Sequence, residues 1–296
     1  IYRINMEFSQ VFEGKEYEMV LGDILDRERL GWAMETYKPQ VVFHAAAYKH
    51  VPIMEAHPGL AVKNNIEGTY NVVKESIRSG VDKFVLISTD KAVRPANVMG
   101  ATKRIAELIC QGMNGENKTK FIAVRFGNVL NSAGSVIPLF KEQIVKGGPV
   151  TVTHPEMTRY FMSIPEAAQL VMQAGAMGRG GEIFVLDMGQ PVKIMDLAND
   201  MIRLMGLKVG DDIDIVYTGL RPGEKLHEEL VSEEEQSVKT MHGKITMVKS
   251  PPVDWPRLKE QIENIVLPIK ENDPAVILDL LVSLIPSQSD RVDPKK

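Results

Sequence analysis

Lys83-Phe-Val-Leu-Ile-Ser-Thr-Asp-Lys91 is the stretch that decides the fold of this chain. Residues 83–87 form a short, mainly apolar run, which is typical of a buried parallel strand. Residues 102–113 carry apolar side chains at helical spacing and predict a helix. We therefore expect the polar residues between them to form a loop at the carboxyl end of a strand, the edge at which open α/β sheets bind ligands.

Strand and helix patterns alternate on both sides of this stretch. Further strands are predicted at residues 17–21, 41–46, 121–126, 182–187 and 213–217, with an edge strand at 244–248. Helices are predicted at residues 26–37, 61–79, 135–146, 165–177, 193–205, 255–265 and 274–285, and residues 1–8 are interpreted as the end of a helix. Alternation at this spacing produces parallel βαβ units with right-handed crossovers. The sequence therefore predicts an α/β fold with a doubly wound, Rossmann-like parallel sheet, followed by a disordered polar tail.

Composition excludes several classes of protein. The chain has 296 residues, and its net charge of −4 comes from 39 acidic and 35 basic residues that are mixed along the sequence. This balance gives no reason to expect nucleic acid or an anionic membrane surface as a partner. The single cysteine, Cys110, cannot form an intrachain disulfide and favours a reducing compartment. No apolar run approaches the roughly 20 residues of a membrane-spanning helix.

The glycine fingerprint of a dinucleotide cofactor is missing from the sequence. Gly-x-Gly-x-x-Gly normally stands at the first strand-to-helix turn, where a helix amino terminus meets the pyrophosphate. The glycine-rich residues 178–181 precede a predicted strand instead of following one. Either the chain lacks the first strand, helix and second strand of such a fold, or it binds no dinucleotide.

Small residues end the predicted strand at 41–46. Ala45 and Ala46 would let a flat ligand lie against the backbone, which larger side chains would prevent. Tight packing of the strand against a helix is the alternative interpretation, and the sequence leaves both open.

Asp90 and Lys91 are candidates for proton transfer. Adjacent residues inside a strand point to opposite faces of a sheet, but these two lie past the strand end, where the backbone turns. Both side chains can therefore face one ligand, and a structural Asp-Lys pair is the alternative. The acidic run at 233–235 is interpreted as the solvated start of a helix, and no metal site is expected.

A series of ordered motifs resembles the extended short-chain dehydrogenases/reductases that act on nucleotide sugars. Within them, the chain resembles the bacterial UDP-N-acetylglucosamine 4,6-dehydratases of the polysaccharide-biosynthesis, CapD-like group. The motifs are Gly22-Asp-Ile24, His44-Ala-Ala-Ala-Tyr-Lys-His-Val-Pro52, Asn65-Ile-Glu-Gly-Thr69, Ser88-Thr-Asp-Lys91, Asn97-Val-Met-Gly-Ala-Thr-Lys103, Arg125-Phe-Gly-Asn-Val-Leu130, Gly134-Ser-Val-Ile-Pro138, Met157-Thr-Arg-Tyr-Phe161 and Arg221-Pro-Gly-Glu-Lys225. The resemblance extends over about residues 1–250.

This resemblance implies a division of the chain into domains. An NAD-binding Rossmann-like domain is expected at residues 1–130, with later segments near 160–190 joining it. A smaller nucleotide-sugar-binding domain is expected at 131–250, and a C-terminal helical extension and tail at 251–296. The family's glycine fingerprint would lie just upstream of Ile1, so its absence is interpreted as truncation, and the isolated chain is expected to bind NAD poorly.

The resemblance also implies a cofactor site, for NAD in preference to NADP. Asp23 and Ile24 would meet the adenine, and Lys103 would hydrogen-bond the nicotinamide ribose. The other residues implied to bind the cofactor are Ala45, Ala46, Lys49, Asn65 and Ser88.

A site for a UDP-sugar is implied in the same way. Asn128 would contact the diphosphate, and Arg221 with Glu224 would hold phosphate and uridine. An arginine suits this role because its planar fork matches phosphate geometry. Lys49 and Arg159 complete the implied set, and a surface ion pair is the alternative for Arg221.

The expected reaction removes water across C5 and C6 of the sugar. The C5 hydrogen becomes acidic only after C4 has been oxidised to a ketone, so the reaction needs a base at C5 and an acid at C6. We assign Lys91 as the base, Asp90 as the acid and Thr89 as the hydrogen-bond partner of O4. Lys91 must be neutral to act, and burial beside a cationic nicotinamide is expected to lower its pKa.

Met99 departs from the superfamily pattern. Most members carry a tyrosine at this position, four residues before the lysine that matches Lys103, and its phenolate takes the O4 proton. A thioether cannot take a proton, so the proton is expected to leave through Thr89, Asp90 or a water held by Lys103. Met99 resembles the branch of dehydratases that retains configuration at C5, and a degenerate, non-catalytic member is the alternative.

The predicted function is therefore dehydration of a UDP-N-acetylhexosamine, with UDP-N-acetylglucosamine favoured, to the UDP-4-keto-6-deoxy sugar for surface glycan synthesis. The enzyme would be a lyase with tightly bound NAD. A UDP-sugar C4 epimerase and a non-catalytic dinucleotide-sensing protein of the same fold are the alternatives. The resemblance further implies a homo-oligomer in the cytoplasm, or on the cytoplasmic face of the inner membrane if a membrane anchor precedes this chain.

Overall fold

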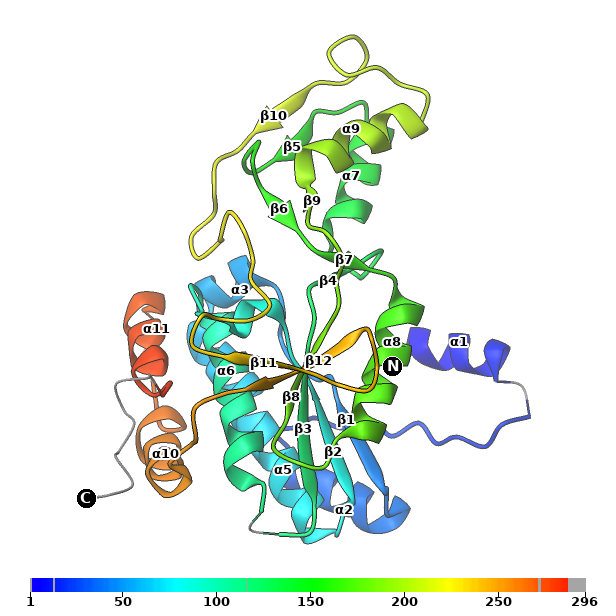
Figure 1. Cartoon of the computed structure of the whole chain (residues 1–296). Coiled ribbons are helices and arrows are strands. Elements are labelled where there is room, and N and C mark those ends of the chain that lie inside the picture. Colours follow the sequence, from blue (N-terminus) through cyan, green and yellow to red (C-terminus); the bar gives the residue numbers. More distant parts are fainter. Residues whose placement is uncertain (1, 13, 116, 271–272, 287–296) are drawn as a thin grey trace.

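A six-stranded sheet forms the centre of the main domain (Figure 1). The structure, a computed structural model, describes residues 2–12, 14–115, 117–270 and 273–286. The strands, in their order across the sheet, are β1 (Val41–His44), β2 (Lys83–Ile87), β3 (Lys120–Arg125), β8 (Ile183–Leu186), β12 (Ile245–Lys249) and β11 (Gln236–Lys239). The first four are parallel, and β12 and β11 extend the sheet antiparallel. The predicted Rossmann-like α/β sheet is confirmed, with an antiparallel extension.

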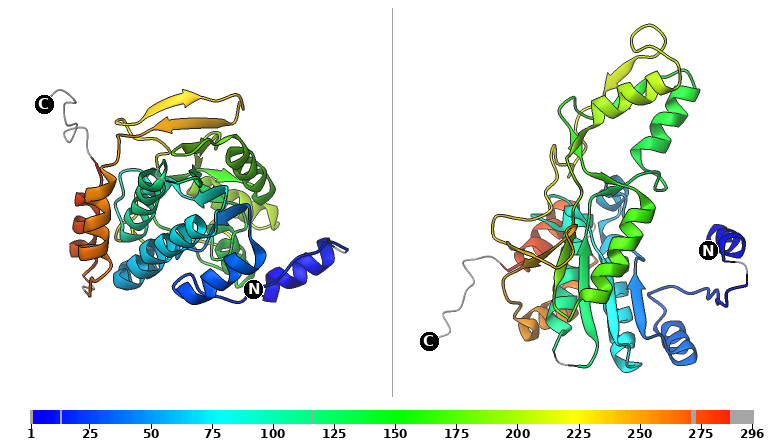
Figure 2. Two further views of the ribbon diagram at one scale, coloured as in Figure 1. Left: turned by 90° about the horizontal axis from the view of Figure 1, so that it is seen from below. Right: turned by 45° about the vertical axis from the view of Figure 1, so that its right-hand side comes forward.

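Helices cover both faces of this sheet (Figure 2). Helix α8 (Ile164–Met177) lies on one face and packs against β2, β3 and β8. The helical segments on the other face are α2 (Arg27–Tyr37), α4 (Pro58–Val62), the π-helical turn η1 (Lys63–Gly68), α5 (Thr69–Arg78) and α6 (Val98–Met113). Helix α1 (Tyr2–Val11) lies apart from the sheet in both figures.

The apolar pattern of β2 explains its central place. Phe84, Val85 and Leu86 are completely buried, as expected for a parallel strand that is covered on both faces. Because side chains alternate along a strand, Phe84 and Leu86 join the core beneath α5 and α6, whereas Val85 joins the core beneath α8. The two cores hold the end of β2, and therefore the loop that follows it, in a fixed position.

A smaller domain lies above the carboxyl ends of the parallel strands (Figure 1). Its elements are α7 (Val136–Val145), β5 (Val150–Val152), β6 (Thr158–Arg159), β9 (Val192–Lys193), α9 (Ile194–Leu204) and β10 (Ile215–Tyr217). Phe140, Val150 and Ile202 belong to its separate apolar core. Where the chain crosses between the domains, β4 (Asn128–Val129) and β7 (Phe161–Met162) pair in parallel and tie the two crossings together.

The C-terminal helices belong to the main core. Helices α10 (Trp255–Gln261) and α11 (Pro274–Ser283) pack against α6, and the π-helical turn η3 (Ile262–Val266) follows α10. Trp255 is buried in the same apolar cluster as Phe84 and Leu86. The predicted polar tail at 287–296 lies outside the described residues.

Several predictions of local structure are wrong. Residues 17–21 form no strand, because no strand among the described residues offers them hydrogen-bonding partners. Residues 245–249 form β12, which is an inner strand between β8 and β11, so β11 is the edge. Residues 233–235 form a turn that leads into β11 instead of starting a helix. Strands β11 and β12 fall within the range predicted for the smaller domain, 131–250, yet they belong to the main sheet.

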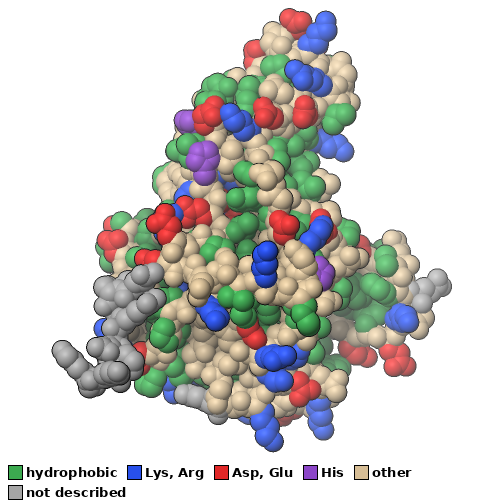
Figure 3. Space-filling view, in the orientation of Figure 1, with side chains coloured by type: hydrophobic (Ala, Val, Ile, Leu, Met, Phe, Trp, Pro, Cys, Tyr) green, Lys and Arg blue, Asp and Glu red, His purple; other side chains and the backbone are tan. Residues whose placement is uncertain are grey.

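The molecular surface carries charges of both signs (Figure 3). Acidic and basic side chains occur over both the upper and the lower part of the face shown there. No helix in the described part of the chain is long and apolar enough to cross a membrane.

Candidate active site

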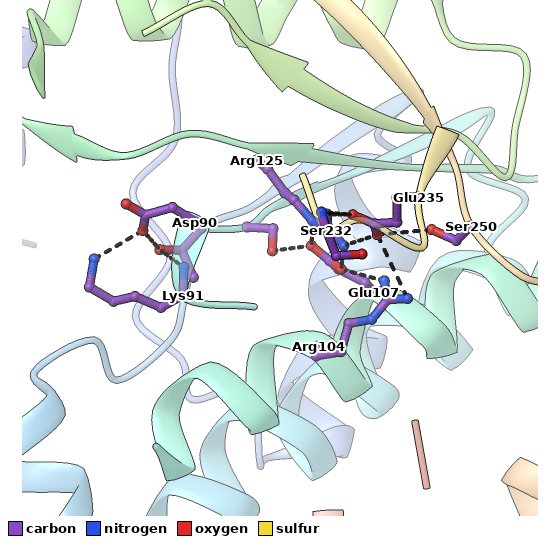
Figure 4. Close-up of polar contacts among 10 residues, drawn as sticks. Asp90, Lys91, Arg104, Glu107, Arg125, Ser232, Glu235 and Ser250 are labelled. Atoms are coloured by element: carbon purple, nitrogen blue, oxygen red, sulfur yellow. Dashed lines mark hydrogen bonds and ion pairs between the residues drawn. The ribbon is translucent and has the colours of Figure 1, made fainter. Parts of the chain in front are cut away.

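The loop after β2 carries the candidate proton-transfer residues. The Asp90 N–H donates to the carbonyl oxygen of Phe126 at 3.1 Å, which continues the pairing of β2 with β3 past the strand end. Asp90–Ala92 (η2) then forms a short 3₁₀ helix, and Thr89 Oγ1 caps it by accepting a hydrogen bond from the Lys91 N–H. The turn breaks the alternation of the strand, so the side chains of Asp90 and Lys91 meet (Figure 4).

Asn97 and Gly100 hold the start of α6 against this loop. Asn97 Oδ1 accepts the Gly100 N–H at 2.7 Å and caps the helix. A Cβ atom at Gly100 would lie 2.2 Å from the carbonyl oxygen of Lys91, so only glycine lets the helix and loop approach this closely. The helix predicted at 102–113 therefore begins earlier, at Val98.

A cleft of about 260 Å³ opens above the loop, between the two domains. The main domain contributes polar residues to its lining, and the smaller domain adds apolar ones such as Val152 and Ile194. The charged residues that line it are Lys49, Lys91, Arg159, Arg221, Glu224 and Glu228. All the residues implied to bind a UDP-sugar, Asn128 included, line this one cleft. Their individual roles stay predictions.

Asp90 and Lys91 form an ion pair beside the cleft (Figure 4). Lys91 Nζ lies 2.9 Å from Asp90 Oδ1, and Thr89 Oγ1 donates to the same oxygen at 2.9 Å. Asp90 is completely buried, and its Oδ2 has no hydrogen-bond partner among the described residues. Lys91 Nζ also lies 3.4 Å from Asn128 Oδ1. The pair therefore joins an ammonium group to a carboxylate with one oxygen still free.

The protonation of Lys91 differs from the sequence-based expectation. Burial by itself would lower the pKa of Lys91, but the carboxylates of Asp90 and Glu228 outweigh it and raise the pKa above its usual value. Lys91 Nζ lies 3.7 Å from Glu228 Oε1. The charges of the chain itself therefore favour the ammonium form, and the effect of a cationic nicotinamide on this pKa stays a prediction.

Arg159 and Glu224 are engaged with the chain itself. The Arg159 guanidinium donates to the carbonyl oxygens of Thr158, Lys225 and Leu226. Arg159 Nη2 also lies 3.6 Å from Glu224 Oε1. These contacts fix residues 224–226 to β6, so positioning is the clearest role of Arg159.

The loop at 220–225 crosses the gap between the domains. Asn97 Nδ2 donates to the carbonyl oxygen of Gly223 at 2.9 Å, and Lys225 Nζ donates to that of Val93 at 2.9 Å. Gly223 has a φ of +72°, and a Cβ there would lie 2.7 Å from Asn97 Cβ, so this position requires glycine. Arg221 stays exposed at the rim, and its guanidinium makes no hydrogen bond within the described residues.

Small exposed residues follow β1, where the cofactor is predicted. Ala45 and Ala46 are both exposed, which leaves the backbone open to a flat group. Asp23 is exposed, and its Oδ1 accepts the Leu25 N–H at 2.9 Å. Ile24 is half-buried and belongs to the margin of the main core.

Asn65 and Ser88 use their polar atoms within the protein. Asn65 is completely buried, and its side chain bonds both backbone groups of Tyr48 and the hydroxyl of Thr102. Ser88 Oγ donates to Glu107 Oε1 at 2.6 Å. These bonds hold the neighbouring loops in place, and a contact of either side chain with the cofactor stays a prediction.

Lys103 carries a buried ammonium group. It is 5% exposed, and no hydrogen bond or ion pair to its Nζ occurs within the described residues. Burial lowers the pKa of Lys103 to about 8. Burial, together with the charge of Lys103, also lowers the pKa of His44 to about 3, so His44 is neutral near pH 7. An ammonium group without a partner in the described residues can donate hydrogen bonds to the hydroxyl oxygens of a ribose.

The residues present thus fit part of a nicotinamide dinucleotide. Ala45 and Ala46 offer an open backbone, and Lys103 offers hydrogen-bond donors. The printed sequence contains no Gly-x-Gly-x-x-Gly turn to receive the pyrophosphate. The fit therefore concerns the nucleoside portions of the cofactor.

Met99 belongs to the apolar core. It is 3% exposed and lies in the same cluster as Ile105 and Leu108 of α6. Among the described residues that line the cleft, Met99 does not appear. The place of Met99 in the catalytic set stays a prediction, and its thioether packs in the core.

Glu228 is a cleft residue that sequence reasoning missed. It is 7% exposed, and its Oε2 is buried with no hydrogen-bond partner among the described residues. Burial raises the pKa of Glu228, and the nearby charge of Lys91 opposes this effect. Its nearness to the motif at 221–225 was the available signal, but an acidic pair at 228–229 resembles a solvated surface.

A buried ionic cluster stands behind the candidate site (Figure 4). The Arg125 guanidinium is completely buried and makes two hydrogen bonds each to Glu107 and Glu235. Arg104 Nη1 also donates to Glu107 at 2.8 Å. Burial alone would raise the pKa of Glu107, but Arg125 and Arg104 lower it to about 2. The cluster reaches Ser88, next to the catalytic loop, and its sequence signal was a charged residue inside the apolar run at 121–126.

Comparison with known proteins shows that the chain is similar to proteins of polysaccharide biosynthesis. The family described as polysaccharide biosynthesis protein matches residues 1–250. The capsular polysaccharide biosynthesis protein CapD of Staphylococcus aureus is 58% identical over 247 residues, which are 83% of this chain and 41% of that protein. The chain thus spans less than half the length of this relative.

Two further relatives differ in their named activities. The UDP-N-acetylglucosamine 4,6-dehydratase (inverting) of Campylobacter jejuni is 36% identical over 233 residues, 77% of this chain and 66% of that protein. The UDP-glucose 4-epimerase of Rickettsia canadensis is 40% identical over 220 residues, 73% of this chain and 62% of that protein. Among solved structures, Pen from Bacillus thuringiensis has a TM-score of 0.77 and 37% identity, covering 84% of this chain and 78% of that chain.

Proposed function

The chain belongs to the polysaccharide biosynthesis protein family, and from this premise we propose that it catalyses the 4,6-dehydration of a UDP-N-acetylhexosamine, in which water is removed across C5 and C6. UDP-N-acetylglucosamine is the favoured substrate, and the UDP-4-keto-6-deoxy sugar is the product. The observation that carries the proposal is the ion pair between the buried Asp90 and Lys91, which lines the interdomain cleft. A C4 epimerase has no use for an acid and a base at C6 and C5.

The residues of the catalytic loop take separate roles in this proposal. A bound NAD would supply the transient oxidation at C4 of the sugar, and it is preferred to NADP on the sequence resemblance alone. Thr89 would hold O4, Lys91 would remove the C5 proton, and Asp90 would donate a proton to the departing C6 hydroxyl. The hydride taken from C4 would return to C6 in place of the departed hydroxyl, and a proton would return to C5. No net oxidation results, so the enzyme would be a lyase.

A single proton shift prepares the pair for this chemistry. Lys91 Nζ lies 2.9 Å from Asp90 Oδ1, within reach of direct proton transfer. Breaking one N–H bond of the ammonium and forming an O–H bond on Asp90 yields a neutral amine and a carboxylic acid. Those are the base and the acid that the reaction needs, although the ground state favours the ion pair.

Cationic residues in the cleft support a substrate that carries a nucleoside diphosphate. Lys49 and Arg221 are exposed at the cleft, and Arg159 lies in its wall. Guanidinium groups suit phosphate oxygens because their paired donors match the geometry. We further propose that the active form is a cytoplasmic homo-oligomer, on the strength of the family resemblance.

Product analysis in D₂O tests the proposal. The protein, with any sequence that precedes Ile1 in its gene, is incubated with NAD and UDP-N-acetylglucosamine, and the sugar is followed by NMR. We expect a C6 methyl group and deuterium at C5, because the base exchanges its proton with solvent. Lys91→Ala should abolish both, whereas Lys146→Ala, at an exposed helix end, should leave them unchanged.

A UDP-sugar C4 epimerase is the second candidate, favoured by the similarity to the Rickettsia enzyme. In that case the product keeps its C6 hydroxyl and gains no deuterium at C5, which would refute the dehydratase. A protein that binds NAD but leaves the sugar unchanged over long incubation would instead be a dinucleotide sensor.

A further inference from the structure

Glu228 is a buried carboxylate that the proposed reaction does not use. It lines the cleft, and its side chain is 3% exposed. Its Oε1 lies 3.7 Å from Lys91 Nζ, but Oε2 has no hydrogen-bond partner among the described residues. A buried carboxylate oxygen without a donor is costly, and such groups normally have a partner. Because Glu228 lines the cleft, a molecule bound there can supply the missing donor.

A cation is a poor candidate for this partner. The Lys91 ammonium lies 2.9 Å from Asp90 Oδ1 and 3.7 Å from Glu228 Oε1, so a positive charge already occupies the place between the two carboxylates. No group of three or more acidic, histidine or cysteine ligands suited to a metal ion is found in the described part of the chain.

A phosphate group is excluded for the opposite reason. Its negative charge would be repelled by a carboxylate in a poorly solvated site. The exposed cation at the rim, Arg221, is the better place for phosphate, whereas Glu228 lies at the buried end with Asp90 and Lys91. Uracil and ribose also carry donors, but the uridine is expected near the rim with the diphosphate and Arg221. We therefore assign the sugar ring to Glu228.

We propose that Glu228 determines specificity for the sugar, because its Oε2 accepts a hydrogen bond from a hydroxyl or amide N–H of the ring. This inference rests on the proposed function only in taking the ligand to be a nucleotide sugar. Glu228 is here a binding residue, and the reaction itself stays with Asp90 and Lys91. Burial raises the pKa of Glu228, and a donor from the sugar would stabilise its ionised form.

Comparing UDP with UDP-N-acetylglucosamine isolates the contact. Both ligands carry the nucleoside diphosphate, and only one carries the sugar. In titration calorimetry, Glu228→Met should weaken binding of UDP-N-acetylglucosamine about 10- to 100-fold, the effect of losing a hydrogen bond to a charged group. Binding of UDP should change less than about twofold, which also shows that the cleft is folded. Glu228→Gln keeps a neutral acceptor. Its affinity for UDP-N-acetylglucosamine should therefore lie between those of Glu228→Met and the unsubstituted protein.

Glu229→Met is the matched control. Glu229 is the adjacent residue, pairs with Arg94 on the surface and does not line the cleft among the described residues. It should leave both affinities unchanged. Equal losses for UDP and UDP-N-acetylglucosamine in Glu228→Met, or no loss for either, would overturn the inference.

The outcomes also separate this inference from the proposed function. Sugar-dependent binding that needs Glu228, in a protein that places no deuterium at C5, would leave the inference standing and refute the dehydratase. If Glu228→Met still dehydrates the substrate and binds it with unchanged affinity, the dehydratase stands and the inference about Glu228 is refuted. An unsubstituted protein that binds UDP and UDP-N-acetylglucosamine equally well would show that no sugar contact exists.

Discussion

Lys91 links the electrostatics of the cleft to a measurable pH dependence. Burial disfavours its charge, but Asp90 and Glu228 outweigh this and raise its pKa, so the ammonium form dominates at neutral pH. In the proposed reaction the pair keeps this proton, which moves from Lys91 to Asp90 and leaves the amine free to act as the base. We therefore expect kcat to stay flat up to about pH 10, and to fall only where the pair loses its proton to solvent. The measurement is kcat between about pH 7 and 10, with stability checked at each pH.

Lys91→Arg is the control for this prediction. Arginine keeps the positive charge beside Asp90 but cannot be deprotonated in proteins, so the variant should be inactive throughout the range. A kcat that rises about tenfold per pH unit across this range would contradict the proton shift within the pair, and an active Lys91→Arg would contradict the role of Lys91 as the base.

The strand β3 and the helix α6 are joined by the buried cluster around Arg125. Its guanidinium satisfies Glu107 of α6 and Glu235 next to β11, so one side chain connects three elements. Arg125→Met would remove the guanidinium that bonds both buried carboxylates and leave them with Arg104 as their remaining cation. We expect a loss of about 3–5 kcal/mol in the free energy of unfolding, measured by urea denaturation.

Arg94→Met provides the comparison within the same chain. Arg94 and Glu229 form an ion pair with half-exposed side chains, and such surface pairs contribute about 0–1 kcal/mol. If the two variants lose the same stability, the buried cluster does not hold these elements together.

The molecule as a whole depends on the docking of its C-terminal helices. Trp255 is 5% exposed and packs closely over α6, where a Cβ at Gly112 would lie 2.4 Å from its ring. Trp255→Ala should therefore lower the free energy of unfolding by about 3–5 kcal/mol, the usual cost of a large core truncation. A single cooperative urea transition at a lower midpoint is expected, because these helices share the main core.

The other tryptophan gives the control. Trp32 is 43% exposed on α2, so Trp32→Ala should shift the midpoint much less. An unchanged midpoint in Trp255→Ala would mean that the C-terminal helices add nothing to the stability of the main domain.

Local pattern determined the main sheet and the place of its catalytic loop. The apolar run before Ser88 is recognisable because a parallel strand buried on both faces needs apolar side chains at every central position, as Phe84, Val85 and Leu86 show. The position of Asp90 and Lys91 just past that run was likewise readable, since the strand end follows from the pattern. The strand predicted at residues 17–21 is absent because a strand also needs a neighbouring strand to pair with, and periodicity does not reveal one.

Tertiary structure alone decided the charges and the partners. Asn65, Ser88 and Met99 have the expected sequence context, but contacts distant in sequence turn them toward the protein interior. The acidic run at 233–235 resembles a solvated surface, yet Arg125 draws Glu235 inward. Together with Asp90, Glu228 raises the pKa of Lys91, although Glu228 lies 137 positions further along the chain. The pKa of a group depends on the charges near it and on its burial. Both are set only when the chain has folded.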